Sequence, residues 1–102
     1  MSAKQKQQNK ANARNNVSIS FLPDGWEDYQ HWEENDPDKH SQVKKLIDAC
    51  LRDPFKGLGR PEPLKGDLSG YWSRRIDQEH LLVYAYEDGT LTVISCRFHY
   101  AK

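Results

Sequence analysis

The sequence lacks any apolar run long enough to cross a membrane. No window approaches the roughly 18 consecutive apolar residues that a transmembrane helix needs, so we expect no membrane span. Cysteine is scarce too, with only Cys50 and Cys96. Both stand in apolar stretches, and no cysteine or histidine pair has metal-ligand spacing. We therefore expect two reduced core thiols in a cytoplasmic protein, although a disulfide between them stays open.

Net charge is also missing, since 15 basic residues balance 15 acidic ones. Bulk charge therefore gives no argument for nucleic-acid binding. The charges are unevenly spread, however. Residues 1–16 carry four basic residues and no acid, residues 17–51 carry 3 basic and 8 acidic, and residues 52–102 carry 8 basic and 7 acidic. An anion site would have to be a local cluster in the C-terminal half.

Apolar residues make up only 36% of the chain, and the deficit is greatest at the N-terminus. Residues 1–16 contain seven Gln or Asn and almost nothing that can be buried. Such a segment cannot offset the entropy of ordering it, and it has no apolar core typical of a signal peptide. We predict a disordered basic tail over 1–16 and a single domain over 17–102.

The domain reads as a strand, two helices and then more strands. Residues 17–21 alternate like a strand, and 24–35 carry an aromatic helical stripe that we expect in the core. Asp36-Pro37 starts a second helix, which ends before Pro54 because a residue preceding proline leaves the helical region. Its apolar stripe consists of Val43, Leu46, Ile47, Cys50 and Leu51.

The second half is rich in strands. Residues 53–70 hold three prolines and four glycines, which indicates a loop, with room for a short strand near 63–68. Three strands follow at 71–76, 80–86 and 90–100, the last two joined by a hairpin turn at Asp88-Gly89. The predicted fold is α+β, with two N-terminal helices packed on one face of a small, mainly antiparallel sheet of four to five strands. The other face is partly free for a site.

An acid, several cations and a terminal histidine occur together in this half. Each alone has an ordinary explanation as a solvated loop or strand-end residue. Together they suit metal-free attack of a ribose 2′-hydroxyl on the adjacent phosphate, which needs a base, donors to the phosphoryl oxygens and an acid. The candidates are Glu62, Lys65, Arg74, Arg75, Arg97, His99 and Tyr100.

Two local features favour this set. Glu62 lies between Pro61 and Pro63, whose fixed φ angles stiffen the loop and orient the carboxylate. Arg74 and Arg75 must point to opposite sheet faces, so one of them reaches the open face. Other chemistries fit poorly. The glycines of 57–66 lack the Lys-Ser/Thr ending of a phosphate-binding loop, and no serine lies in a nucleophile elbow.

The motifs resemble a known family. "DPF-G-G-PEPLK", "LSG-WSRRI--EH-LVY" and the ending "CR-HY" are similar to those of the YoeB/Txe toxins of the RelE/ParE superfamily, over about residues 17–100. The resemblance implies a fold like that of microbial ribonucleases and a toxin that cuts mRNA in the ribosomal A site without a metal or other cofactor. It also implies a YefM/Axe-like antitoxin, the 70S ribosome as partner, operator DNA bound only through the antitoxin complex, and a homodimer.

Carried over by position, the resemblance makes Glu62 the general base and His99 the general acid or a phosphate contact. Lys65 and Arg75 would hold the scissile phosphate, and Tyr100 would position the mRNA. Arg74 and Arg97 are not placed by the resemblance, but as members of the cation cluster we predict them as further substrate contacts.

One position departs from the family pattern. The family reads "EHRLVY", and this chain has Leu81 where the arginine stands. Loss of one preorganised charged donor lowers rates on the order of 10²–10³-fold, and a leucine would lie on a face expected to be wet. Two alternatives to an active nuclease therefore stay open. One is a silent module that acts through antitoxin binding and operon repression. The other, disfavoured by the acid–base set, is a ParE-like gyrase poison.

Overall fold

A computed structural model describes residues 17–98 of the chain. The predicted tail and the candidates His99 and Tyr100 lie outside the described residues. The elements run β1 (Ser18–Phe21), α2 (Pro23–Asn35), α3 (Pro37–Arg52), β2 (Glu62–Pro63), the 3-10 helix η1 (Gly66–Leu68), β3 (Trp72–Arg75), β4 (Leu81–Glu87) and β5 (Thr90–Ser95). The predicted fold class is confirmed. Neither helix is long and apolar enough to cross a membrane.

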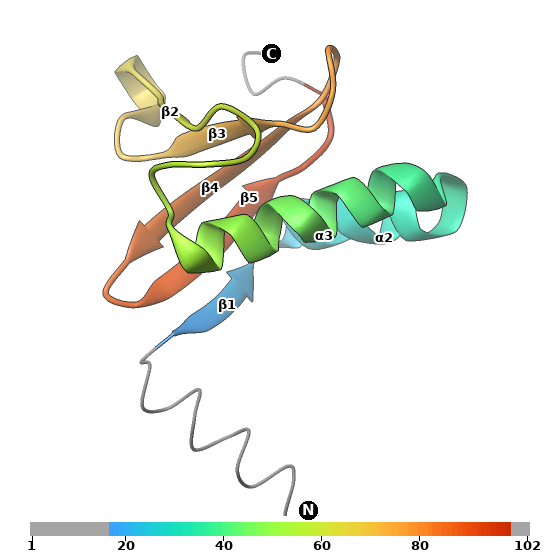
Figure 1. The fold of residues 1–102 in the computed structure, drawn as a ribbon, viewed down its shortest axis with the longest axis horizontal. Helices are drawn as coiled ribbons and strands as arrows, with labels where there is room; N and C mark the ends of the chain where they lie inside the picture. Colours follow the sequence, from blue (N-terminus) through green and yellow to red (C-terminus); the bar gives the residue numbers. More distant parts are fainter. Residues whose placement is uncertain (1–16, 99–102) are drawn as a thin grey trace, which may run out of the picture.

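The five strands form one sheet in the order β1-β5-β4-β3-β2. Strand β1 pairs with β5 in parallel, with Ser18 opposite Thr90. All other neighbours are antiparallel. The first and last strands in the sequence therefore lie side by side, and the short β2 forms the far edge (Figure 1).

Both helices begin with a proline at their first turn, where the missing N–H costs no hydrogen bond. Asp36 caps α3 by accepting a hydrogen bond from the Lys39 backbone N–H at 3.1 Å. In α2, Gly25 allows the helix to lie directly on β5. A Cβ at Gly25 would come within 2.6 Å of the Val93 carbonyl oxygen, which no side chain tolerates.

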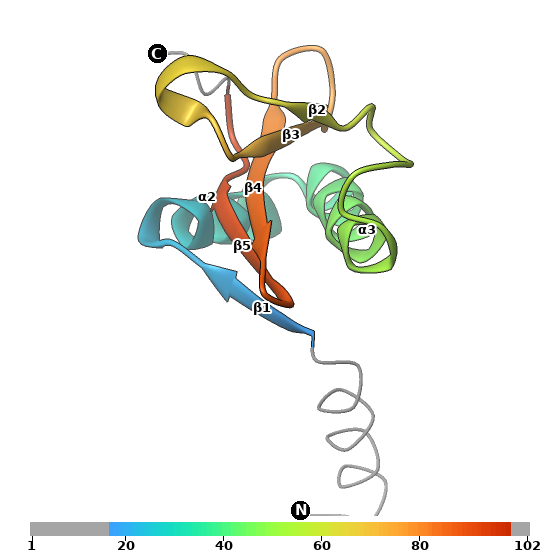
Figure 2. The same cartoon turned by 90° about the vertical axis from the view of Figure 1, so that its left-hand side faces the viewer.

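The sheet has a core on each face. The larger core lies between the sheet and the helices and includes Trp32, Val43, Leu46, Leu82, Tyr84, Leu91 and Val93. A smaller cluster of Leu64, Leu81 and Val83 lies on the other face, with Leu68 and Tyr71 packed against it. The segment from β2 through η1 thus covers the sheet on the side away from α3 (Figure 2). Cys50 and Cys96 are free and buried, as predicted.

Three local predictions were wrong. Strand β5 ends at Ser95 rather than at residue 100, because the Asp28 carboxylate accepts the Cys96 N–H at 3.0 Å. The loop strand is Glu62–Pro63, and η1 (Gly66–Leu68) takes the second half of the strand expected at 63–68. Within the aromatic stripe, Trp32 is buried but Trp26 is 48% exposed.

Candidate active site

A pocket of about 300 Å³ opens where β2, β3 and the start of β4 meet. It holds two arginines, two carboxylates and two polar side chains against one leucine. The described residues that line it are Arg60, Glu62, Ser73, Arg75, Asp77, Gln78 and Leu81. Glu62, Arg75 and Leu81 are thus brought together from three separate segments.

Glu62 reaches the pocket on a short, well-fixed strand. It pairs with Ser73 of β3, and the next residue but one, Leu64, donates its N–H to the Tyr71 carbonyl at 2.9 Å. Pro61 and Pro63 restrict the backbone on both sides. The Glu62 side chain is exposed and lines the pocket.

Arg75 lies opposite Leu81 across the β3–β4 pair. Its side chain is exposed and lines the pocket, while its backbone N–H donates to the Gly59 carbonyl at 2.6 Å. Gly59 has φ +85°, and a Cβ there would approach a Leu46 methyl to 2.7 Å. The loop before Glu62 therefore packs tightly against both α3 and β3, and it carries Arg60 to the pocket.

Arg74 points to the opposite face and is fully buried. Its guanidinium donates to the carbonyl oxygens of Asp53, Leu58 and Lys56 at 2.5, 2.9 and 3.0 Å and to the Tyr84 hydroxyl at 3.1 Å. Tyr84 in turn donates to the Pro54 carbonyl. Burial raises the pKa of Tyr84 to about 12 despite the nearby Arg74. Arg74 fastens the 53–58 loop, and this placement corrects the prediction that it binds substrate.

Leu81 is only 8% exposed and packs with Leu64 and Val83. The expectation that it lies on a wet face was wrong, because the β2–η1 segment covers that part of the sheet. Leu81 forms an apolar wall of the pocket at the position where the family pattern has an arginine.

Asp77 is the second carboxylate of the pocket and is already engaged. Lys39 of α3 donates to one oxygen, and the N–H groups of Glu79 and His80 donate to the other at 2.8 Å each. Partial burial alone would raise the pKa of Asp77, but these hydrogen bonds outweigh it and lower the pKa to about 2. Asp77 is therefore a fixed anion whose two oxygens already accept hydrogen bonds.

The other predicted residues are less closely associated with the pocket. Lys65 is exposed and precedes η1; it is not among the described lining residues. Arg97 is half-buried, with its guanidinium carbon 4.7 Å from the centre of the Phe98 ring. His99 and Tyr100 lie outside the described residues.

Sequence reasoning missed Arg60, Ser73, Asp77 and Gln78 as pocket residues. For Arg60 the signal was present, because residues two apart in an extended segment share a side, and Arg60 precedes Glu62 by two. For Asp77 and Gln78 no sequence signal was present, because the turn that carries them was predicted only as a connection between strands.

Comparison with known proteins identifies the family. Residues 21–100 match the family described as YoeB-like toxins of bacterial type II toxin–antitoxin systems. The chain belongs to this YoeB-like toxin family. Toxin YoeB of Streptomyces coelicolor is 56% identical over 84 residues, which are 82% of this chain and all of that protein. The chain is therefore a toxin of such a system.

Solved structures of YoeB-like toxins show the same fold. A YoeB/ParE toxin from Agrobacterium tumefaciens has a TM-score of 0.79 and 46% identity, over 82% of this chain and 100% of that one. A heterotetrameric YoeB–YefM complex from Staphylococcus aureus has a TM-score of 0.77 and 39% identity, over 82% and 98% of the two chains. Staphylococcus aureus YoeB has also been solved as a dimer, with a TM-score of 0.77 and 38% identity, over 83% and 99%.

Proposed function

We propose that this YoeB-like toxin is a ribosome-dependent, metal-independent endoribonuclease that cuts mRNA in the A site. The observation that carries the proposal is the shared pocket of Glu62 and Arg75, held on paired strands at the free end of the sheet. For the ribose 2′-hydroxyl to attack the adjacent phosphate, the site needs at least a base that takes the hydroxyl proton and a cation that stabilises the phosphoryl charge.

The reaction balances with the residues available. Glu62 takes the proton of the ribose 2′-hydroxyl, and the 2′-oxygen bonds to phosphorus. The bond from phosphorus to the 5′-oxygen breaks, and His99 gives that oxygen a proton, which leaves a 2′,3′-cyclic phosphate and a 5′-hydroxyl end. Arg75, with Lys65 and Arg97 as further contacts, balances the phosphoryl charge. Tyr100 positions the mRNA by stacking.

The partners follow from the same proposal. A toxin with no net charge does not hold RNA by bulk attraction, so the 70S ribosome aligns the A-site mRNA. A YefM-like antitoxin, the partner of the related Staphylococcus aureus toxin, inhibits the cytoplasmic toxin, and operator DNA is bound only through that complex. A homodimer is expected by the same analogy.

The test is primer extension on mRNA in a translating extract, using this chain, its Leu81→Arg variant and the Glu62→Gln form of each. We expect A-site cuts that Leu81→Arg strengthens on the order of 10²–10³-fold and that Glu62→Gln removes. Chelation of free metal, with magnesium restored to keep the ribosome intact, should leave the cuts unchanged. Absence of cleavage by both Glu62 forms would refute the proposal.

A second candidate is a catalytically silent module that binds antitoxin and represses its operon. The burial of Leu81 in an apolar cluster favours it, because the pocket then lacks one charge donor. Growth after induction without antitoxin separates the two functions. Full tolerance supports the silent module, whereas an arrest that Glu62→Ala abolishes excludes it.

A further inference from the structure

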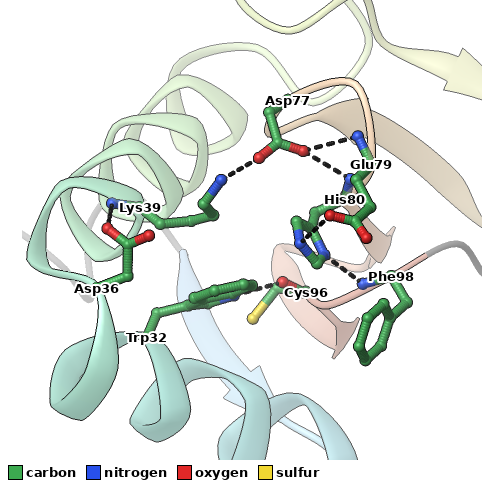
Figure 3. A network of polar contacts seen from close by, with 8 residues as sticks. All are labelled: Trp32, Asp36, Lys39, Asp77, Glu79, His80, Cys96 and Phe98. Atoms are coloured by element: carbon green, nitrogen blue, oxygen red, sulfur yellow. Dashed lines mark hydrogen bonds and ion pairs between the residues drawn. The ribbon is translucent and has the colours of Figure 1, made fainter.

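His80 is a buried histidine with a role that the acid–base set does not explain. It ends the turn before β4 and is 6% exposed. Its ring packs between Trp32, at 4.8 Å between ring centres, and Phe98, at 5.2 Å. Figure 3 shows the imidazole between the helical layer and the end of the described chain.

One nitrogen of the imidazole binds the protein backbone. Its Nδ1 accepts the Phe98 N–H at 2.7 Å. A backbone N–H can only donate, so Nδ1 carries no proton and the ring proton is on Nε2, which lies 3.4 Å from Glu79 Oε1. This bond therefore requires the neutral Nε2–H tautomer.

Phe98 needs such an anchor. Its φ is +59°, a left-handed conformation that is uncommon for a bulky residue. Phe98 is 42% exposed, so its side chain is only partly buried. Its carbonyl accepts the Leu81 N–H at 3.2 Å. The backbone of Phe98 is thus held on one side by His80 and on the other by Leu81, a wall of the pocket.

His80 is itself held from two layers. The backbone N–H of His80 donates to the Asp77 carboxylate at 2.8 Å. Asp77 is in turn paired with Lys39 of α3. On the other side, Trp32 of α2 packs against the His80 ring and donates from Nε1 to the Cys96 carbonyl at 2.7 Å. Both helices therefore fix the imidazole and the backbone that leads to Phe98 (Figure 3).

We propose that His80 is a positioning residue for the nuclease reaction: its neutral imidazole fixes the Phe98 backbone and so the point beside Leu81 from which the chain continues into His99 and Tyr100. The inference rests on the proposed function. It gives His80 no contact with substrate and no proton transfer. Its effect is to place the acid and the mRNA-positioning ring relative to Glu62, where a 1 Å displacement can cost about 10²-fold in rate.

The first experiment needs no catalysis. His80→Phe keeps an aromatic ring between Trp32 and Phe98 and removes the nitrogen acceptor. His40→Phe is the matched control, because His40 also packs edge-on against an aromatic ring, that of Tyr29, at 4.7 Å. By NMR, we expect the Phe98 amide to exchange about tenfold faster in His80→Phe, as loss of one hydrogen bond implies, with core strand amides unchanged. His40→Phe should leave Phe98 unchanged.

The imidazole itself gives a second signature. Long-range nitrogen–proton correlations in the unmodified chain should show His80 as the Nε2–H tautomer. Observation of an Nδ1–H tautomer, or unchanged Phe98 exchange in His80→Phe, would overturn the proposal.

The catalytic consequence is measured in the Leu81→Arg chain on programmed ribosomes. His80→Phe should lower kcat about 10- to 100-fold with KM nearly unchanged, since geometry and not binding is lost. His80→Asn returns an acceptor near the Nδ1 position and should recover part of kcat. Equal kcat in His80→Phe and His40→Phe would overturn the positioning role. If no Glu62-containing chain cleaves, the proposed function and the catalytic role fail together, while the exchange data still decide whether His80 holds Phe98.

Discussion

Lys39 of α3 and Asp77 of the β3–β4 turn form an ion pair that joins the helical layer to the rim of the pocket. The side chains are 24% and 33% exposed, so water still screens the pair. The ion pair also orients the turn, because the same Asp77 carboxylate accepts hydrogen bonds from the backbone N–H groups of Glu79 and His80. One contact thus shapes the turn that leads into β4.

This pair gives a prediction for acid stability. The pKa of Asp77 is lowered from 3.8 to about 2 in the folded protein, so the stabilisation is present above about pH 4 and is lost as pH falls towards 2. Asp77→Asn should cost about 1 kcal/mol at pH 7 and flatten the loss of stability between pH 4 and 2. Urea unfolding at several pH values measures both. Asp67→Asn, in the exposed η1, is the control, and an unchanged pH slope in Asp77→Asn would contradict the prediction.

The neighbouring arginines should respond oppositely to the same substitution. Arg74→Met leaves three loop carbonyls without their donor, and we expect a loss of about 2–4 kcal/mol in unfolding free energy. Arg75→Met removes an exposed side chain, so stability should change by less than about 0.5 kcal/mol while cleavage falls about 10²-fold or more. Denaturation and primer extension on both variants check this. Loss of cleavage without loss of stability in Arg74→Met would restore it as a substrate contact.

Arg60 should matter most where Leu81 is present. Arg60 and Arg75 are the two arginines among the described residues that line the pocket with Glu62, and in this chain Leu81 adds no third one. We expect Arg60→Gln to lower cleavage about tenfold or more in this chain and less in the Leu81→Arg chain, where a third cation is supplied. The coupling is read from a double-mutant cycle of cleavage rates. Arg52→Gln, outside the pocket, is the control, and equal losses in both backgrounds would rule out the sharing of charge.

The two cysteines should be inert in the folded protein. Burial raises the pKa of Cys50 to about 11 and that of Cys96 to about 12, and the reactive species is the thiolate. A thiol reagent such as DTNB at pH 8 should therefore label neither cysteine in native protein and both in urea. Stoichiometric labelling of the native chain would show that one of these sites opens.

The local sequence predicted the helices well because their signals are local. The stripe from Val43 to Leu51 and the Asp36-Pro37 start define α3 without knowledge of its partners. The end of β5 could not be found this way, since it depends on Asp28, a residue 68 positions away. Whether a strand continues depends on whether its next backbone N–H donates to the neighbouring strand or to another acceptor.

The site was predicted in part for the same reason. Alternation showed that Arg74 and Arg75 face opposite ways, but only the carbonyls of the 53–58 loop decide which one is buried. The burial of Leu81 could not be predicted locally, because it depends on Leu64, Leu68 and Tyr71, which pack in the same cluster on that face of the sheet. The role of His80 had no sequence signal, because its partner is a backbone N–H in a segment expected to be strand.

The parallel pairing of β1 with β5 sets the order in which the molecule can be completed. Helix α2 rests on β5 through Gly25, and the Trp32 indole donates to the Cys96 carbonyl. Strand β1 and helix α2 therefore lack their partner strand until β5 has been made, and the sheet closes across 72 residues of sequence. Such distant contacts slow folding. On a translating ribosome, β1 and α2 emerge before the strand they pack on, and they cannot take their final places until synthesis has passed β5.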